Sequence, residues 1–482
     1  MIFIIYLKER RLRMFRFLIL LITLITSCTM APNRINIGED IPQKFFDRDY
    51  KVEKKAIGGK QWWRKFKDPN LNSFIDSVIT RNLDLKIAIK RLNSVEALFD
   101  IKKGGQYPSI AAGFSGSKSR GPVPTMKLTQ LGPVIGKERK TTESYSFRTG
   151  LSYELDIWGK IRSQKKGAYE VLLSSKSDLK TVYLSIISSA ITLYYDYQYL
   201  NREIVDSRRS LTLLERVERY SKIRYSKGVI TKSVYDLVIN NRNLLKVKIL
   251  NLESGLEKLK NGIAILLGEY NLSFFRSSDN FSFPLSDLNI KTIDLSSDIL
   301  KNRSDIVSAY HKMESIRYEI GAAKADLFPS IKLSFDLLSS VERIEDLFNY
   351  DNLTTSMGGN FSQILFAGGS KLANLNRIEA NYYQAVLNYR KSIIVGFNDI
   401  KNSIIDLESA SNNYKILKEN YDLAEKNMKR AKNQYKEGII TYSKLLEIEQ
   451  DYLEKEISLY TAEKGIIQSY IKLNRSLGGN WI

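Results

Sequence analysis

The chain has 482 residues, a formal net charge of +21, a single cysteine and a single histidine, His311. One cysteine excludes a disulfide within the chain, and one histidine excludes a zinc site built on a histidine pair. Because it has no glycine-rich phosphate loop, nucleophile elbow, Cys/His dyad or clustered basic stripe, we expect no enzyme, no cofactor and no nucleic-acid partner.

The amino terminus carries a basic stretch, then an apolar stretch, then the only cysteine. The apolar run 17–25 is too short to remain in a membrane as a helix and is typical of a secretory signal. Ile25-Thr26-Ser27-Cys28 follows it and is similar to the lipobox, in which the cysteine is lipidated. We therefore predict a signal peptide over residues 1–27, lipidation of Cys28 and a lipid-anchored segment over residues 28–60. A chance cysteine after a signal peptide is the alternative.

The two halves of the sequence repeat each other. Tyr225-Ser-Lys-Gly228-Val-Ile-Thr231 returns as Tyr435-Lys-Glu-Gly438-Ile-Ile-Thr441, and Leu267-Gly268 returns as Leu477-Gly478, both 210 residues later. The unit is far larger than the period of roughly 20 to 50 residues that indicates a solenoid. We predict a first repeat over residues 61–268, a linker over 269–298, a second repeat over 299–479 and a tail over 480–482.

Each repeat is expected to consist mainly of long helices. No proline occurs between Pro133 and Pro284 or after Pro329, so nothing interrupts a helix there. Apolar residues recur at alternating steps of four and three, the spacing of a coiled coil, in the stretches 179–204, 245–266 and 393–414. We predict hairpins that turn at Gly228 and Gly438, the first with a helix of about 100 Å from residue 160. Several stacked shorter helices are the alternative.

Before each long helix lie two segments in which apolar and polar residues alternate. We predict strands at about residues 107–118 and 143–157, and again at about 328–339 and 353–365. Such strands can span a bilayer with their apolar face toward lipid, or form a soluble sheet packed on a helix. The connectors 119–142 and 340–352 are polar or rich in glycine and proline, which favours the long outer loops of a membrane barrel.

The number of strands bears on assembly. A bilayer barrel must be closed and needs at least about eight strands, whereas one chain supplies only four predicted strands. We therefore expect two, three or four chains to share one barrel.

Several motifs together resemble one family. Trp62-Trp63-Arg-Lys-Phe66-Lys-Asp68-Pro69 near the start, Tyr153-Glu-Leu-Asp156-Ile-Trp158-Gly159-Lys160 before the first long helix, and Leu327-Phe328-Pro329-Ser-Ile331 before the third strand are similar to those of TolC-like outer-membrane factors. The match is to the NodT-type efflux lipoproteins and extends from about residue 40 over nearly the whole mature chain. In this order the motifs are highly specific, although each is modest alone.

This resemblance implies a fold that is mainly α with membrane β. Three copies of the duplicated unit would form a 12-stranded β-barrel in the bacterial outer membrane, continued by a 12-helix α-barrel through the periplasm. The homotrimer would be the passive exit duct of a tripartite pump, for drugs, metals or other small molecules. Its partners would be outer-membrane lipid, a periplasmic adaptor of the membrane fusion protein class and an inner-membrane pump of the RND type.

The two glycine turns would then lie at the periplasmic tips, where such proteins meet the adaptor. The candidate docking residues are Arg224, Tyr225, Gly228, Thr231, Ser233, Tyr435, Gly438, Thr441 and Ser443. Glycine permits the tight reversal whether or not a partner binds, so simple hairpin geometry is the alternative.

Some positions depart from the family. Ser304 and Tyr310 stand where proline and an acidic residue are usual. At the second tip, Glu447 fits an acidic position that narrows the closed pore, but Lys444 replaces another and is placed to pair with Glu447 one turn away. Lys444 and Glu447 are our gate candidates. Two other functions stay open, namely a lipid-anchored periplasmic coiled-coil scaffold without a pore and an exit duct for type I protein secretion.

Overall fold

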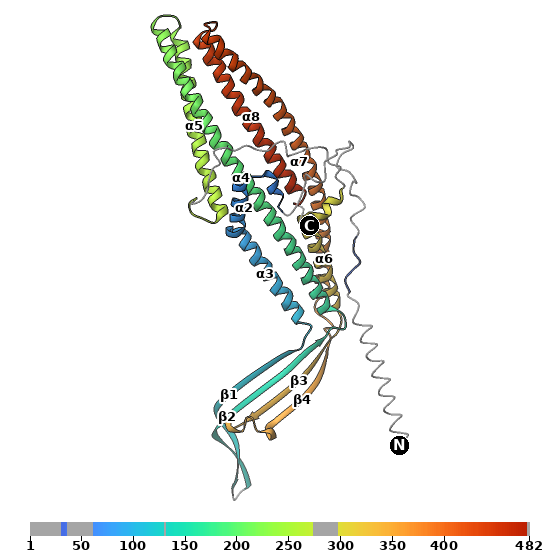
Figure 1. The fold of residues 1–482 in the computed structure, drawn as a ribbon. Coiled ribbons are helices and arrows are strands. Elements are labelled where there is room, and N and C mark those ends of the chain that lie inside the picture. Colours follow the sequence, from blue (N-terminus) through green and yellow to red (C-terminus); the bar gives the residue numbers. More distant parts are fainter. Residues whose placement is uncertain (1–29, 36–60, 130–131, 273–296, 480–482) are drawn as a thin grey trace. The chain divides into compact units, whose positions relative to one another are not determined.

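The computed structural model describes residues 30–35, 61–129, 132–272 and 297–479. They belong to two compact units, and each unit takes residues from both sequence repeats, so the units are not the repeats. Unit 1 comprises Met1–Ile35, Val95–Leu172 and His311–Val386; unit 2 comprises Asn36–Ser94, Leu173–Tyr310 and Leu387–Ile482. Figure 1 shows the elements in chain order.

The first elements are fixed by an aromatic cluster and a helix cap in unit 2. The 3-10 helix η3 (Trp62–Phe66) buries Trp62, Trp63 and Phe66. The ring of Phe66 lies 5.4 Å from that of Tyr195, measured between centroids. Helix α2 (Pro69–Arg81) begins with proline, and Asp68 caps it by accepting from the amides of residues 70 and 71. The tryptophan motif is therefore part of the core.

Four long helices dominate the fold, as the sequence predicts. They are α4 (Lys160–Ser226), α5 (Lys232–Leu267), α7 (Ser370–Lys436) and α8 (Tyr442–Ser476). Helices α4 and α7 have 67 residues each, or about 100 Å at 1.5 Å per residue. The buried core of unit 2 includes Ile187 and Ile191 of α4, Ile400 of α7 and Ile467 of α8.

Two shorter helices, α3 (Leu83–Gly104) and α6 (Ser304–Ala325), occupy the same place in the two repeats. The 3-10 helix η5 (Ser297–Asn302) precedes α6. Each short helix leads into a strand pair, so the predicted order of helix, two strands, long helix and return helix holds in both repeats.

The strands form one antiparallel sheet in unit 1, in the order β1-β2-β3-β4. Their bounds are β1 (Ser109–Thr129), β2 (Gly132–Leu155), β3 (Ser330–Val341) and β4 (Leu353–Ser362). Strand β2 of the first repeat pairs with β3 of the second, for example Leu151 with Phe335, so one sheet joins the repeats. Two short 3-10 helices, η6 (Ile344–Asp346) and η7 (Tyr350–Asn352), connect β3 to β4.

The predicted loop over residues 119–142 is wrong. Strands β1 and β2 continue through it as a hairpin ladder that ends at the pair Thr129 and Gly132. The sequence is misleading because Pro122 and Pro124 normally interrupt a sheet, but β1 is an edge strand of this sheet, and an edge position tolerates a residue without an amide donor. The connector in the second repeat contains the two 3-10 helices and remains largely outside the strands.

The sheet meets the helices at an aromatic junction in unit 1. The indole Nε1 of Trp158 donates to the carbonyl oxygen of Pro329 at 2.8 Å. Its ring stacks on Phe328, with 4.7 Å between centroids. The motif that contains Trp158 and the motif that contains Phe328 and Pro329 therefore contact each other where the strands join the helices.

Several predictions lie outside the described residues. These are the signal peptide 1–27, the lipidation site Cys28, the tail 480–482, most of the segment 28–60 and most of the linker 269–298. Within the described part of the chain, none of the helices has both the length and the hydropathy needed to span a membrane.

Candidate functional site

The two hairpin tips have the same backbone geometry. Gly228 and Gly438 adopt φ of 71° and 73°, the left-handed region that glycine enters without a steric penalty. In the first tip, the amide of Gly228 donates to the carbonyl of Tyr225 and the amide of Val229 to that of Arg224, both at 2.9 Å. The second tip repeats both bonds from Gly438 and Ile439. This is the Schellman motif, which satisfies the last carbonyls of a helix.

A threonine starts the return helix at each tip. Thr231 caps α5 by accepting from the amide of Val234, and Thr441 caps α8 by accepting from the amide of Lys444. The predicted tip residues Gly228, Thr231, Gly438 and Thr441 therefore each have a structural role. An adaptor is not needed to explain them.

The tyrosines distinguish the two tips. Tyr225 stacks on Tyr235 of the same hairpin, with 5.6 Å between ring centroids. At the second tip Tyr442 contacts Tyr435 at 5.6 Å and also Tyr220 of α4 at 5.5 Å. Tyr442, which the sequence reading did not select, thus connects the two hairpins.

The remaining candidates lie on exposed or half-exposed surface. The Arg224 guanidinium lies 5.8 Å from the ring centroid of Tyr220. Ser233 is exposed and Ser443 half-buried, each in the first turn of a return helix. The predicted pair is present, because Lys444 Nζ lies 2.8 Å from Glu447 Oε2. Both side chains are well exposed, so the lysine locally neutralises the acidic position.

An ion ladder that the sequence reading missed runs along the seam between α4 and α8. Its members recur every seven residues: Arg202, Arg209 and Arg216 on α4, and Glu449, Glu456 and Glu463 on α8. Arg216 Nη2 lies 3.2 Å from Glu449 Oε1, and Arg209 Nη1 lies 3.8 Å from Glu456 Oε2. Tyr460 donates to Glu456 at 2.9 Å and lies under the guanidinium of Arg202. The heptad spacing of opposite charges on two helices was the available signal.

Burial makes parts of this ladder sensitive to protonation. Burial raises the pKa of Glu463, while the nearby charge of Arg202 counteracts it in part. Leu213, Leu446 and Leu453 are buried between the charged rungs and give the seam an apolar core.

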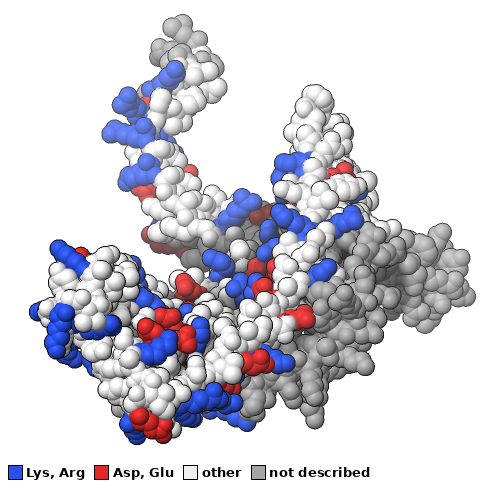
Figure 2. All heavy atoms as spheres, turned by 90° about the horizontal axis from the view of Figure 1, so that it is seen from above, with Lys and Arg blue, Asp and Glu red and all other residues white. Residues whose placement is uncertain are grey.

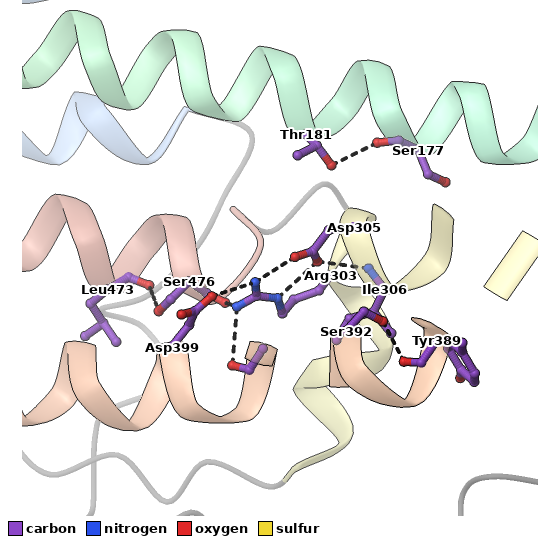
Figure 3. A network of polar contacts seen from close by, with 11 residues as sticks. Ser177, Thr181, Arg303, Asp305, Ile306, Tyr389, Ser392, Asp399, Leu473 and Ser476 are labelled. Carbon is purple, nitrogen blue, oxygen red and sulfur yellow. Dashed lines mark hydrogen bonds and ion pairs between the residues drawn. The ribbon is translucent and has the colours of Figure 1, made fainter. Parts of the chain in front are cut away.

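Next to Ser304, which stands where proline is usual in the family, a buried arginine joins three helices (Figure 3). Arg303 donates to both carboxylate oxygens of Asp305, at 3.1 and 2.7 Å, and to Asp399 of α7 at 3.3 Å. It also donates to the carbonyl oxygens of Gly396 and Ser476, at 3.4 and 2.8 Å. These bonds hold the start of α6 against α7 and the end of α8, all within unit 2.

This network alters protonation at its acidic member. Burial alone would raise the pKa of Asp305, but the hydrogen bonds and charge of Arg303 outweigh it and lower that pKa. Ser304 takes the first position of α6.

The polar face of the sheet pairs its charges. Arg148 donates to Asp336 through Nε and Nη2, at 3.1 and 2.9 Å. Gly150 stands directly opposite Asp336, and a Cβ there would come within 2.7 Å of its carboxylate oxygen. Lys332 lies 4.0 Å from Glu154 on the same face. The opposite face exposes large apolar side chains.

Figure 2 shows Lys and Arg interspersed with Asp and Glu over much of the visible face, whereas basic side chains predominate along the arm at the upper left. His311 is engaged in unit 1, with Nδ1 2.6 Å from Glu170 Oε2. Among the described residues, no group of three or more His, Cys, Asp or Glu side chains is arranged to hold a metal ion.

A duplicated chain of long helical hairpins carrying a four-stranded sheet has counterparts among known proteins. The outer membrane efflux protein family matches residues 74–236 and 295–479, and the chain belongs to it. Its fold is that of the TolC-like channels, and the family predicted from the sequence motifs is confirmed.

Two relatives and one solved structure illustrate the relationship. The solvent efflux pump outer membrane protein SrpC of Pseudomonas putida is 26% identical over 419 residues, 86% of each chain. The probable outer membrane lipoprotein SilC of Salmonella typhimurium is 23% identical over 457 residues, 94% of this chain and 96% of SilC. The CmeC outer membrane channel of Campylobacter jejuni superposes with a TM-score of 0.77 at 22% identity, covering 94% of this chain and 95% of CmeC. The chain is accordingly an outer-membrane efflux channel component.

Proposed function

We propose that three copies of the chain assemble into one outer-membrane duct. Each copy contributes four strands to a 12-stranded barrel, and its two hairpins contribute four helices to a 12-helix periplasmic tube. Solutes that an inner-membrane RND-type pump hands to a periplasmic adaptor leave through this duct without catalysis.

The observation that carries the proposal is the sheet. A four-stranded sheet has two edges, β1 and β4, and unpaired strand edges are unfavourable in a bilayer. One face also exposes Ile110, Phe114, Met357 and Phe361, each more than half exposed in the single chain. Lipid would cover that face, and neighbouring copies would pair with both edges.

A lipid anchor at Cys28 fits the contacts of the residues that follow it. In unit 1, which also contains the sheet, Arg34 Nε lies 2.9 Å from the fully buried Glu314 of α6. Arg317 donates to the carbonyl oxygen of Pro32 at 2.8 Å. At Gly321 a Cβ would come within 2.7 Å of the amide nitrogen of Ala31, so the glycine leaves room for the segment. These contacts support an anchor at Cys28, because residues 31–34 lie against the unit that contains the sheet.

The glycine tips are proposed as the adaptor-docking edge, and Lys444 with Glu447 as part of the periplasmic gate. The exposed Tyr225, Ser233 and Tyr435 and the half-buried Arg224 give the tips polar and aromatic groups for a partner. The cargo class is small molecules such as drugs, metals or solvents. The relative SrpC is named for solvent efflux.

The decisive experiment measures assembly and conductance together. The purified full chain in detergent should have three times the protomer mass, and it should conduct ions when added to planar bilayers. Palmitate labelling of wild type and of Cys28→Ala tests the anchor in the same preparation, with the label lost in the variant. A folded monomer without conductance would favour the pore-less scaffold and overturn the duct.

A further inference from the structure

Strands β1 and β2 continue well beyond the four-stranded part of the sheet in unit 1 (Figure 1). The last pair between β2 and β3 is Tyr145 with Val341, whereas β1 and β2 remain paired as far as Thr129 and Gly132. The long helix α4 begins at the other end of the sheet, directly after β2. In the proposed duct the helices lie in the periplasm, so this two-stranded extension projects from the outer surface of the membrane.

One face of the β1–β2 pair changes character along its length. Residues directly opposite each other in the ladder share a face, and each strand returns to that face at every second residue. Near the helices this face carries Ile110 and Phe114, which are 75% and 58% exposed. Phe147 and Tyr145 stand on the same face, opposite Phe114 and Gly116. An apolar band that ends in aromatic residues is typical of the lipid-facing side of a membrane barrel and of its interfacial girdle.

Beyond this aromatic girdle the same face becomes basic. Lys118 comes first and is neutralised by Glu143 directly opposite, with 2.6 Å between Nζ and Oε1. Arg120 of β1 and Arg139 and Lys137 of β2 follow on this face and are named here the basic cluster. All three are exposed, and none of them forms a hydrogen bond or ion pair with another described residue. The chain therefore places three uncompensated cations just beyond its lipid-facing band.

The basic cluster is restricted to one face and to one repeat. Glu138 and Lys140 alternate with its members along β2, so they lie on the opposite face, where their charges have opposite sign. In the second repeat the connector 340–352 contains four acidic residues and one basic residue, a net charge of −3. Charge that served only solubility would not need this placement. The asymmetry favours an anionic partner on the lipid side of the first hairpin.

We propose that the basic cluster binds headgroup phosphates of a phosphorylated glycolipid in the outer leaflet of the membrane. Arginine recognises phosphate through two parallel hydrogen bonds, and clusters of Lys and Arg beside a membrane bind anionic headgroups. The inference rests on the proposed duct, which places the hairpin outside the bilayer, and it adds a lipid partner. A soluble anion would not require cations on the same side as the lipid-facing residues.

The distances along the strands fit a headgroup layer. Arg120 stands opposite Thr141, four residues beyond Tyr145, or roughly 14 Å along the strand. Arg139 is six residues beyond Tyr145, or roughly 20 Å. Because barrel strands tilt by about 40°, these lengths correspond to heights of about 10 and 15 Å above the girdle. Long side chains extend such a position back toward the lipid surface.

Binding of fluorescent diphosphoryl lipid A by the purified full-length protein in detergent tests the proposal. Arg139→Ala should weaken binding about fivefold, because a cation at an anionic lipid surface contributes about that factor, and Arg120→Ala with Arg139→Ala roughly 25-fold. Arg120→Lys with Arg139→Lys keeps both charges and should lose less than the alanine pair. Lys140→Ala is the matched control, since it removes the same charge from the opposite face of the same strand. It should bind like wild type.

Two competitors identify the ligand. Unlabelled diphosphoryl lipid A should displace the fluorescent lipid, whereas inorganic phosphate at the same ionic strength should not. Displacement by inorganic phosphate would assign the cluster to a free anion, and equal losses in Arg139→Ala and Lys140→Ala would assign binding to net charge. Either result would overturn the lipid site. If the protein still forms conducting trimers in planar bilayers, only the lipid site fails; if wild type forms neither trimers nor conducting channels, the proposed function fails.

Discussion

The two repeats anchor the ends of their return helices with different chemistry. In the first repeat, the buried Asn82 donates from Nδ2 to the carbonyl oxygen of Leu266 at 2.9 Å, and its Oδ1 accepts from the amide of Leu85. In the second, Arg303 donates to the carbonyl oxygen of Ser476. Leu266 and Ser476 are 210 residues apart, so duplication has preserved the acceptor while the donor has changed.

The comparison shows what each donor connects. Asn82 is neutral and joins only the start of α3 to the end of α5. Arg303 is charged and also recruits Asp305 and Asp399, so it joins α6, α7 and α8. The second junction therefore depends on charge and the first does not.

The largest effect is expected for Arg303→Ala. It leaves two carboxylates and two carbonyl oxygens without their common donor, and we expect a loss of about 3 kcal/mol, since both carboxylates are partly solvated. Thermal unfolding of the helices, followed by circular dichroism in detergent, measures it. Arg303→Lys is the matched control, and its single point charge should restore only part of the loss. A wild-type melting curve for Arg303→Ala would contradict this account of the junction.

A smaller effect is expected for Asn82→Ala. The variant loses the cap of α3 and leaves one carbonyl of α5 without its donor, which costs about 1–2 kcal/mol. Asn82→Asp separates the two roles, because it keeps the capping oxygen but presents an acceptor to the Leu266 carbonyl. The same unfolding measurement should place Asn82→Asp no higher than wild type. If Asn82→Asp were more stable than wild type, the hydrogen bond to the Leu266 carbonyl would not contribute to stability.

The tips should respond alike in both repeats. Gly228→Ala and Gly438→Ala each force a side chain into the left-handed region, at about 1 kcal/mol, although neither site has an atom within 4 Å of the added Cβ. Gly465→Ala is the control, because this glycine lies inside α8 in open space and alanine should stabilise the helix. Hydrogen exchange of the tip amides is the local measurement. Unequal responses would show that the two glycine turns differ in stability although their backbone geometry is the same.

Acid should weaken the charged junction only. Although burial opposes it, the arginine holds the pKa of Asp305 below its ordinary value. The ionised Asp305 therefore contributes its full stabilisation above its unfolded pKa of about 4. This contribution is lost as the pH falls through the lower pKa of the folded state. The stability difference between wild type and Asp305→Asn should shrink from pH 6 to pH 3. The stability difference between wild type and Asn82→Ala should stay constant over the same range. A parallel decline of the two stability differences would show that the two junctions do not differ in their dependence on charge.

Sequence patterns predicted backbone features better than side-chain partners. The absence of proline and the heptad spacing predicted α4 and α7, and the repeated glycines predicted both turns. The hairpin of β1 and β2 was cut short because Pro122 was interpreted as a loop residue, and only its edge position in the sheet makes it compatible with a strand. Arg209 donates to Asp206 in its own helix, but its partner across the seam, Glu456, lies 247 residues away. The heptad spacing of the charges indicates a seam, but only the adjacency of the two hairpins shows which helices form it.

The smallest effect is expected at the second tip, where two charged residues take the place of apolar residues in the first repeat. Lys444 and Glu447 correspond to Val234 and Leu237 in the first repeat, both exposed apolar residues. If three copies bring the second tips together at the periplasmic mouth, three Glu447 carboxylates repel one another, and the Lys444 ammonium 2.8 Å from each reduces that repulsion. Glu447→Ala should raise leak conductance modestly, because it leaves three unpaired Lys444 charges that repel one another in the closed mouth. Lys444→Asp should create an acidic ring and make conductance sensitive to divalent cations. Single-channel recording with and without divalent cation measures both, with Val234→Asp as the matched control outside the gate. Equal sensitivity in Val234→Asp would assign the response to charge anywhere near the tips, and wild-type currents in all three variants would place Lys444 and Glu447 away from the pore.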